Sequence, residues 1–213
     1  FVLTGDIDLS GVSFEAVHSF SGTLDGNGYW IRGLTTDTKT AGGSILFETI
    51  AAEAQIKDLG LEIRVSATGA NQPQIDGLCN SNQGTISGCT VNSTISGLRS
   101  YSPIAASNTG TVSNCKTATE SESCQSVRGI LGSNKGTVKE CQVTITAKNG
   151  GVEALIDRNY SGSVELCYAA VTVESCHFFD GLASQNYAPF KNCTVSGQIA
   201  STREDDFYWN GTA

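Results

Sequence analysis

Five of the eight cysteines stand at a fixed interval of 26 residues, and this spacing constrains the fold more than any other feature of the chain. The five are Cys89, Cys115, Cys141, Cys167 and Cys193. Fixed periods of about 20–50 residues are typical of repeat architectures, in which each unit stacks on the next. The spacing therefore predicts a solenoid with one coil for each period.

Other positions keep the same period. The residues three before each cysteine are apolar: Ile86, Val112, Val138, Val164 and Phe190. The residues eleven before each cysteine are also apolar: Leu78, Ile104, Ile130, Ile156 and Leu182. A further column holds Asn82, Asn108, Asn134 and Asn186, and Tyr160 interrupts it. Upstream, with looser spacing, Ile31 and Ile56 are expected to precede Ile86 in its column, which gives about seven coils.

Within each period the sequence alternates between apolar and polar residues. The segments CTVNSTI and CQVTITA each place three apolar side chains on one face, which is the pattern of a strand. Triplets of the form Asn-x-Gly are expected to supply the left-handed backbone of the corners. A unit of this size cannot bury its own apolar face, so equivalent strands of successive units are expected to pair in parallel.

The fold class that follows is all-β, a single-stranded parallel β-helix of about seven rungs, each of about 26 residues. Right-handed coiling is expected because parallel crossovers favour that hand. A propeller blade needs a longer unit, and the signature of leucine-rich repeats is missing. We expect residues 1–35 to form an N-terminal cap with the first rung, residues 36–200 the β-helix repeats, and residues 201–213 a C-terminal cap or linker.

Charge and hydropathy exclude two classes of partner. Lys and Arg number 13 against 21 Asp and Glu, which gives a net charge of −8. Nucleic acids and anionic membranes require basic surfaces, so neither is expected as a partner. No apolar run approaches the ~18 residues of a membrane span. The chain opens on Phe1 and has no Met, as expected of a processed chain or a domain of a longer protein.

The repeats resemble the GLUG-type repeat of bacterial surface proteins, whose pattern runs G-L-hydrophobic-G-x-N-x-G-x-I-x-x-C-x-hydrophobic. The chain reads DGLCNSNQGTISGCTV and RGILGSNKGTVKECQV at matching places, and the likeness covers about residues 4–200. This resemblance implies a secreted or cell-surface bacterial protein. It implies no shared catalytic residues, and it leaves a host protein, a glycan or adjacent domains of the parent chain as partners.

The cysteines admit several chemical roles. Zinc ligands converge on a point, whereas these cysteines form a line and the only histidines are His18 and His177. We therefore expect neither a metal nor another cofactor. The favoured interpretation is a structural ladder of small buried side chains, with disulfides between neighbouring rungs as the alternative. Cys124 and Cys176 are two periods apart, about 9.6 Å, which is too far for a disulfide.

Catalysis of glycoside hydrolysis requires two carboxylates about 5–9.5 Å apart. On a β-helix, such a pair is expected at outward positions one period apart. A constant period of 26 aligns Asp157 with Leu131, and it aligns Asp180 with Arg128 and Ala154. The constant period therefore predicts that no two carboxylates stack in neighbouring rungs of the regular region, that there are no catalytic residues, and that the chain is not an enzyme.

The remaining acids are predicted to be structural or exposed. Glu165 aligns with Lys139 and Lys191, which indicates an exposed charge ladder. Four N-terminal acids fall outside the regular spacing, and insertions could bring them together: Asp6, Asp8, Asp25 and Asp58.

Aromatic residues gather near the chain ends. Tyr29 and Trp30 lie in the first rung and Trp209 lies near the C-terminus. Caps over the open ends of the solenoid are the favoured role, and the alternatives are a glycan-binding platform or a contact with a neighbouring domain. The function expected overall is a non-catalytic extracellular module, for adhesion, for host or glycan interaction, or as a rigid spacer. The alternatives are a polysaccharide-active or carbohydrate-binding β-helix, or an accessory domain of a surface peptidase.

Overall fold

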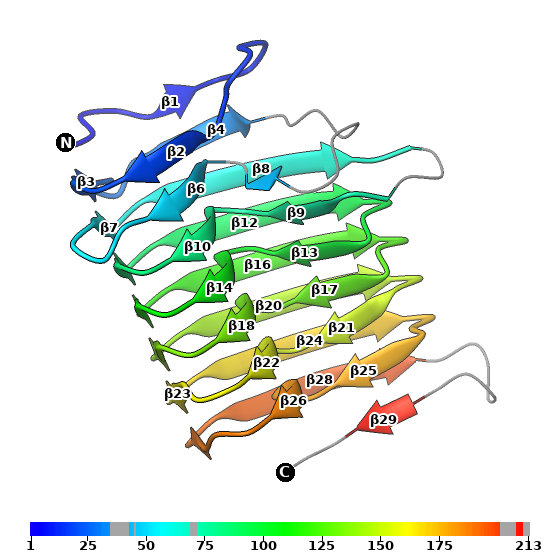
Figure 1. Cartoon of the computed structure of the whole chain (residues 1–213). Coiled ribbons are helices and arrows are strands. Elements are labelled where there is room, and N and C mark those ends of the chain that lie inside the picture. The colour runs from blue at the N-terminus through cyan, green and yellow to red at the C-terminus, as the bar shows by residue number, and fades with distance from the viewer. Residues whose placement is uncertain (35–42, 45, 69–71, 201–207, 211–213) are drawn as a thin grey trace.

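The chain folds into a parallel β-solenoid of about seven turns, as the repeat predicted. The structure, a computed structural model, describes residues 1–34, 43–44, 46–68, 72–200 and 208–210. The described residues form strands and turns without a helix, so none of them provides a helix that could cross a membrane. Figure 1 shows the coils stacked along one axis, with the first coil at the top and the last at the bottom.

Each regular coil contributes one strand to each of four parallel sheets, which we name in the order in which a complete coil passes through them, starting from the sheet with the longest strands. The long sheet contains β1 (Ile7–Asp8), β4 (Trp30–Leu34), β8 (Gly60–Ser66), β12 (Thr90–Ser96), β16 (Lys116–Glu122), β20 (Gln142–Lys148), β24 (Tyr168–Glu174) and β28 (Thr194–Ala200). The second sheet contains β5 (Gly43–Ser44), β9 (Gln74–Asp76), β13 (Ser100–Ser102), β17 (Ser126–Arg128), β21 (Gly151–Glu153), β25 (Phe178–Asp180) and β29 (Tyr208–Asn210).

The other two sheets complete the coil. The third sheet contains β2 (Val17–Phe20), β6 (Phe47–Ile50), β10 (Cys79–Asn82), β14 (Ala105–Asn108), β18 (Leu131–Asn134), β22 (Ile156–Asn159) and β26 (Ala183–Asn186). The fourth sheet contains β3 (Thr23–Asp25), β7 (Gln55–Lys57), β11 (Thr85–Ser87), β15 (Thr111–Ser113), β19 (Thr137–Lys139), β23 (Ser163–Glu165) and β27 (Phe190–Lys191). Of the predicted C-terminal cap or linker, only β29 lies within the described residues.

The five periodic cysteines form one column, as predicted. Each directly precedes a strand of the long sheet, and those strands pair in register from β12 to β28. Cys89, Cys115, Cys141 and Cys167 are buried, and Cys193 is half-buried because it lies in the last coil. All eight cysteines of the chain are free thiols.

The left-handed corners lie elsewhere than predicted. Asn114, Glu140 and Leu166 have φ of 53–55°, and each directly precedes a ladder cysteine. The glycines of the Asn-x-Gly triplets are needed for a different reason, because successive coils approach each other closely there. A Cβ on Gly110 would lie 2.1 Å from the carbonyl oxygen of Gly84.

The first coil has a different register from the predicted one. Leu24 pairs with Ile56, so it is Leu24 and not Ile31 that begins the column of Ile86. Ile31 pairs with Leu61 on the long sheet. The first coil has no ladder cysteine, so its apolar residues fit either column equally well and the sequence pattern alone leads to the wrong one.

One coil departs from the constant period by a single residue. Val127 and Val152, which pair, are 25 residues apart, whereas Val152 and its next partner Phe179 are 27 apart. The interval between paired residues is one residue shorter at β21, and it is again 26 residues at β23, where Thr137 pairs with Ser163. This shift overturns the predicted alignments of residues 150–160, and the asparagine column and the acids are affected most.

The asparagine column is continuous because Asn159, and not Tyr160, occupies the shifted coil. Each side-chain amide nitrogen donates to the amide oxygen of the asparagine in the next coil, at 2.7–3.1 Å. The ladder consists of Asn82, Asn108, Asn134, Asn159 and Asn186, and only the last is exposed. These bonds satisfy polar groups in an otherwise apolar interior, where an unpaired amide would be unfavourable.

Candidate functional site

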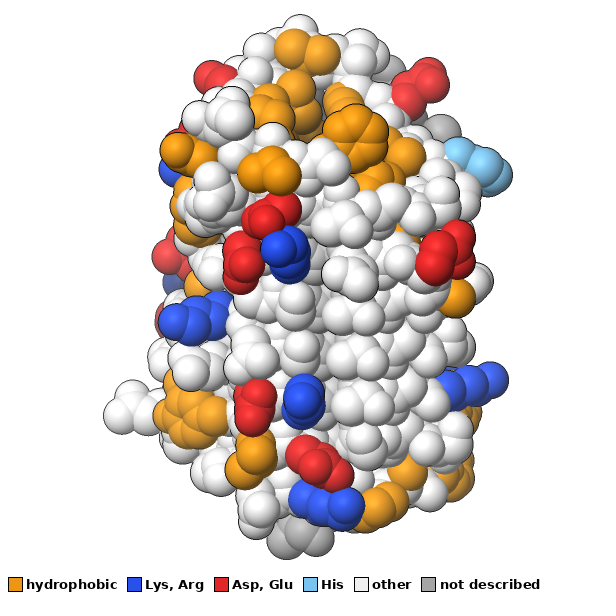
Figure 2. All heavy atoms as spheres, turned by 90° about the vertical axis from the view of Figure 1, so that its left-hand side faces the viewer, with side chains coloured by type: hydrophobic (Ala, Val, Ile, Leu, Met, Phe, Trp, Pro, Cys, Tyr) orange, Lys and Arg blue, Asp and Glu red, His pale blue; other side chains and the backbone are white. Residues whose placement is uncertain are grey.

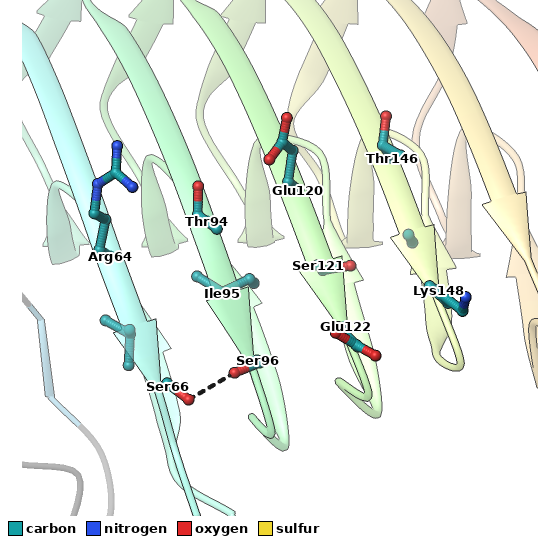
Figure 3. A pocket seen from close by; sticks show the side chains of 12 residues that line it. Arg64, Ser66, Thr94, Ile95, Ser96, Glu120, Ser121, Glu122, Thr146 and Lys148 are labelled. Atoms are coloured by element: carbon teal, nitrogen blue, oxygen red, sulfur yellow. Dashed lines mark hydrogen bonds between the residues drawn. The ribbon is translucent and has the colours of Figure 1, made fainter.

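A groove of about 560 Å³ crosses the last three residues of four successive strands of the long sheet, β8, β12, β16 and β20. Apolar atoms, including those of Val65, Ile95 and Ala147, make up most of its accessible lining. Nine of its twelve lining residues nevertheless have polar side chains: Arg64, Ser66, Thr94, Ser96, Glu120, Ser121, Glu122, Thr146 and Lys148. Figure 3 shows Arg64, Thr94, Glu120 and Thr146 in one row across the strands. A second hollow, of about 510 Å³, continues toward the strand centres and shares this row.

Strand alternation explains why these side chains face outward, except that of Ser121, which is buried. In β12, Val91, Ser93 and Ile95 are buried, while Asn92 and Thr94 are exposed. Parallel pairing without a register shift then places equivalent outward residues of neighbouring coils side by side, about 4.8 Å apart. The groove is therefore a regular array in which each coil contributes the same outward positions, and equivalent side chains of neighbouring coils form rows across the strands.

The basic side chains of the groove form ion pairs, whereas its two acidic side chains form none with the described residues. Arg64 Nε lies 2.9 Å from Glu62 Oε1, and Lys148 Nζ lies 3.7 Å from Glu174 Oε2. These exposed pairs contribute little to stability. Glu120 and Glu122 form no ion pair with any residue that the structure describes. The two central carboxylates therefore leave the middle of the groove acidic.

The three aromatic residues predicted as a platform are not brought together. Trp30 pairs with Gly60 at the start of β8, the end opposite the groove. Its ring lies against Gly60, where a Cβ would be 2.3 Å from a ring atom, and the guanidinium of Arg32 is 5.0 Å from the ring centroid. Tyr29 is half-buried beside it. Trp209 belongs to β29, and its side chain lies outside the described part of the chain.

A different aromatic pair is exposed, and the sequence analysis missed it. The rings of Tyr160 and Tyr187 lie parallel, with centroids 6.1 Å apart, and Lys135 Nζ lies 5.6 Å from the Tyr160 centroid. The one-residue shift puts these three residues into one column next to the asparagine ladder. The sequence therefore contains the signal for this aromatic pair, but the pair becomes apparent only once the one-residue shift is taken into account.

The fourth sheet carries exposed ion pairs. Its side of the molecule faces the viewer in Figure 2, where acidic and basic side chains lie beside each other in small groups on a mostly uncharged surface. Lys191 Nζ lies 2.9 Å from Glu165 Oε1, and Glu165 also pairs in register with Lys139, which confirms the predicted charge ladder. Lys57 Nζ lies 2.8 Å from Asp25 Oδ2.

The prediction that no carboxylates stack in neighbouring coils is wrong. Glu153 on β21 pairs directly with Asp180 on β25, and on its other side with Arg128 on β17. Glu153 and Asp180 are only 5% and 7% exposed. Arg128 Nη2 lies 3.1 Å from Asp157 Oδ2. The constant period had aligned Asp180 with Ala154, one residue away from its actual partner.

Hydrogen bonds and burial affect the pKa values of the carboxyl groups in this row. Ser126 Oγ donates to both oxygens of Glu153, at 3.1 and 2.9 Å. Burial raises the pKa of Glu153 to about 7, against the opposing effect of Arg128. Burial likewise raises the pKa of Asp180, and it raises the pKa of Asp76, two coils before Arg128 in the same row, to about 6.

The two histidines do not form a further site within the part of the chain that the structure describes. His18 and His177 are exposed, and His18 contacts Glu48. Within the described ranges, no three His, Cys, Asp or Glu side chains are placed to hold a metal ion.

Comparison with protein-family models, curated proteins and solved structures gave no match. The function must therefore be argued from the geometry of this chain.

Proposed function

We propose that the chain is a non-catalytic, glycan-binding module of a bacterial surface protein, and that the groove on the long sheet is its binding site. The observation that carries the proposal is the array of hydroxyl, carboxylate and cationic side chains that four successive strands hold in register. The resemblance of the repeats to GLUG-type sequences supports a location at the cell surface.

The chemistry of the groove suits a sugar chain. Thr94 and Thr146 offer hydroxyl groups that donate and accept hydrogen bonds, as sugar hydroxyls require. Ser96 Oγ donates to Ser66 Oγ at 2.8 Å, which leaves the Ser66 hydroxyl as a donor. The coil spacing of about 4.8 Å is close to the length of one pyranose unit in an extended chain. Successive sugar units would then meet equivalent positions on successive coils, and the paired sheet would hold those positions rigid before binding.

The charge of the groove narrows the class of glycan. Glu120 and Glu122 stand at its centre on a chain of net charge −8. Their carboxylates would repel uronic acids and attract amino groups. We therefore assign the groove to neutral or amino-sugar oligosaccharides in preference to acidic polysaccharides.

The same pair of carboxylates bears on catalysis. Glu120 and Glu122 are two residues apart on one strand, about 6.6 Å along its axis, which is a separation that glycosidases use. A general acid in such an enzyme needs a pKa raised by an apolar environment. Both groove glutamates are exposed and lack such surroundings, so we propose binding without turnover.

An oligosaccharide array containing neutral, amino-sugar and uronate chains tests the proposal, followed by calorimetry with the strongest binder. We expect Thr94→Val and Glu120→Gln each to weaken binding about tenfold, the effect of losing ~1.4 kcal/mol. Thr111→Val on the fourth sheet is the matched control and should bind normally. Binding that survives both groove substitutions would contradict the site, release of shorter sugars would contradict the non-catalytic role, and no binding would favour the spacer role.

A further inference from the structure

Glu153 lies where charged groups from three other strands meet. On β17 it faces Arg128 and Ser126, and on β25 it faces Asp180. On β22 the neighbouring groups are Asp157, which forms the ion pair with Arg128, and Arg158, whose Nε lies 3.8 Å from Asp157 Oδ1. The side chains of Arg128 and Asp157 are each 13% exposed, whereas that of Arg158 is 48% exposed.

These charges do not balance when every group is ionised. Three carboxylates, of Glu153, Asp157 and Asp180, then face one largely buried guanidinium, and Arg158 is half in solvent. Carboxylates in neighbouring coils, about 4.8 Å apart, repel each other, and burying an uncompensated charge is unfavourable. Asp157 has the direct ion pair with Arg128, so the proton that relieves the imbalance belongs on Glu153.

We propose that Glu153 is a pH-sensitive switch for the corner between the second and third sheets, closed when its carboxyl is protonated and loosened when the carboxyl ionises. The pKa of about 7 that burial gives Glu153 places the change in the physiological range. The switched element is the segment from β21 to β22, since it carries both Glu153 and Asp157. This inference is independent of glycan binding on the long sheet.

The switch is tested on the full chain by following the Glu153 carboxyl carbon by NMR together with amide hydrogen exchange. We expect the carboxyl to titrate near pH 7. Between about pH 4 and this midpoint, exchange of residues 151–159, corrected for the intrinsic pH effect, should rise by up to about tenfold per pH unit and then level off above the midpoint, while exchange in β12 should not rise.

Substitutions separate the switch from a general pH effect. Glu153→Gln mimics the protonated carboxyl and should remove the pH-dependent part of the exchange, whereas Glu165→Gln, in the exposed pair with Lys191, should leave it unchanged. Asp180→Asn offers a second route if Glu153→Gln fails to fold, because removing one negative charge should lower the pH at which Glu153 titrates. A midpoint below pH 5, or equal exchange at both pH extremes in the unsubstituted chain, would overturn the proposal.

Discussion

The asparagine ladder offers a quantitative test of how the coils are joined. Asn134, in a middle coil, is fully buried. Its amide oxygen accepts from Asn108 Nδ2 at 2.8 Å and from the backbone N–H of Gly136 at 3.1 Å, and its own Nδ2 donates to Asn159 Oδ1 at 3.1 Å. Replacing Asn134 with alanine removes these three bonds and the 3.4 Å bond from its Nδ2 to the carbonyl oxygen of Gly136, which still accepts from the N–H of Ser163.

The expected loss follows from the groups left without a partner. Asn108 Nδ2 keeps its bond to the carbonyl oxygen of Gly110, at 3.3 Å, whereas the N–H of Gly136 and Oδ1 of Asn159 lose the partners described above. Each orphaned buried group costs about 1–3 kcal/mol, so Asn134→Ala should lower the free energy of unfolding by about 2–6 kcal/mol. That is a large part of the 5–15 kcal/mol typical of a folded domain.

Urea unfolding followed by circular dichroism measures this loss, with Asn186→Ala as the matched control. Asn186 also accepts from the preceding asparagine, at 3.1 Å, but it is exposed in the last described coil of the ladder, so water can replace it there. Its substitution should cost about 1 kcal/mol or less. Equal losses for the two variants, or a loss below about 1 kcal/mol for Asn134→Ala, would refute the stabilising role of the ladder.

Three further outcomes are expected. Cys141→Asp should lower the melting temperature strongly, because burying a carboxylate in the thiol column costs several kcal/mol, and an unchanged melting temperature would mean that Cys141 faces solvent. Because the pKa values of Asp76 and Glu153 are raised to about 6 and about 7, the folded chain binds more protons than the unfolded chain between about pH 4 and pH 7, so the free energy of unfolding should fall as pH rises through that window. Denaturant titrations at several pH values check this, and a rise in stability over the same window would contradict it. Gly110→Ala should destabilise by about 1–3 kcal/mol because its Cβ would lie 2.1 Å from a carbonyl oxygen of the previous coil, whereas Gly181→Ala, with open space around it, should not; equal melting temperatures would argue against the close approach.

The architecture could be predicted from the sequence because each coil repeats the same burial problem. A cysteine, an apolar residue three before it and alternating residues after it recur at one interval, and only parallel stacking buries all of them. The error came from assuming that the interval never changes. Leu155 and Ile156 are adjacent and both buried, so a shift of one residue leaves an apolar residue in the expected column and escapes notice.

The candidate sites were harder to predict for related reasons. The buried pair of Glu153 and Asp180 becomes visible only with the shifted register. Asn159, next to the Tyr160 that seemed to break the asparagine column, was the available clue to that shift. The acidic groove was not predicted because stacked carboxylates are expected one coil apart, whereas Glu120 and Glu122 lie two residues apart on one strand.

The most direct test of the proposed function is a map of backbone amide shifts by NMR, with the labelled chain titrated by the strongest-binding oligosaccharide of the array. Binding at the groove predicts shifts confined to the outward residues at the ends of β8, β12, β16 and β20, with the sugar recovered intact. Shifts centred instead on Tyr160 and Tyr187, or recovery of cleaved sugar, would contradict a non-catalytic binding groove on the long sheet.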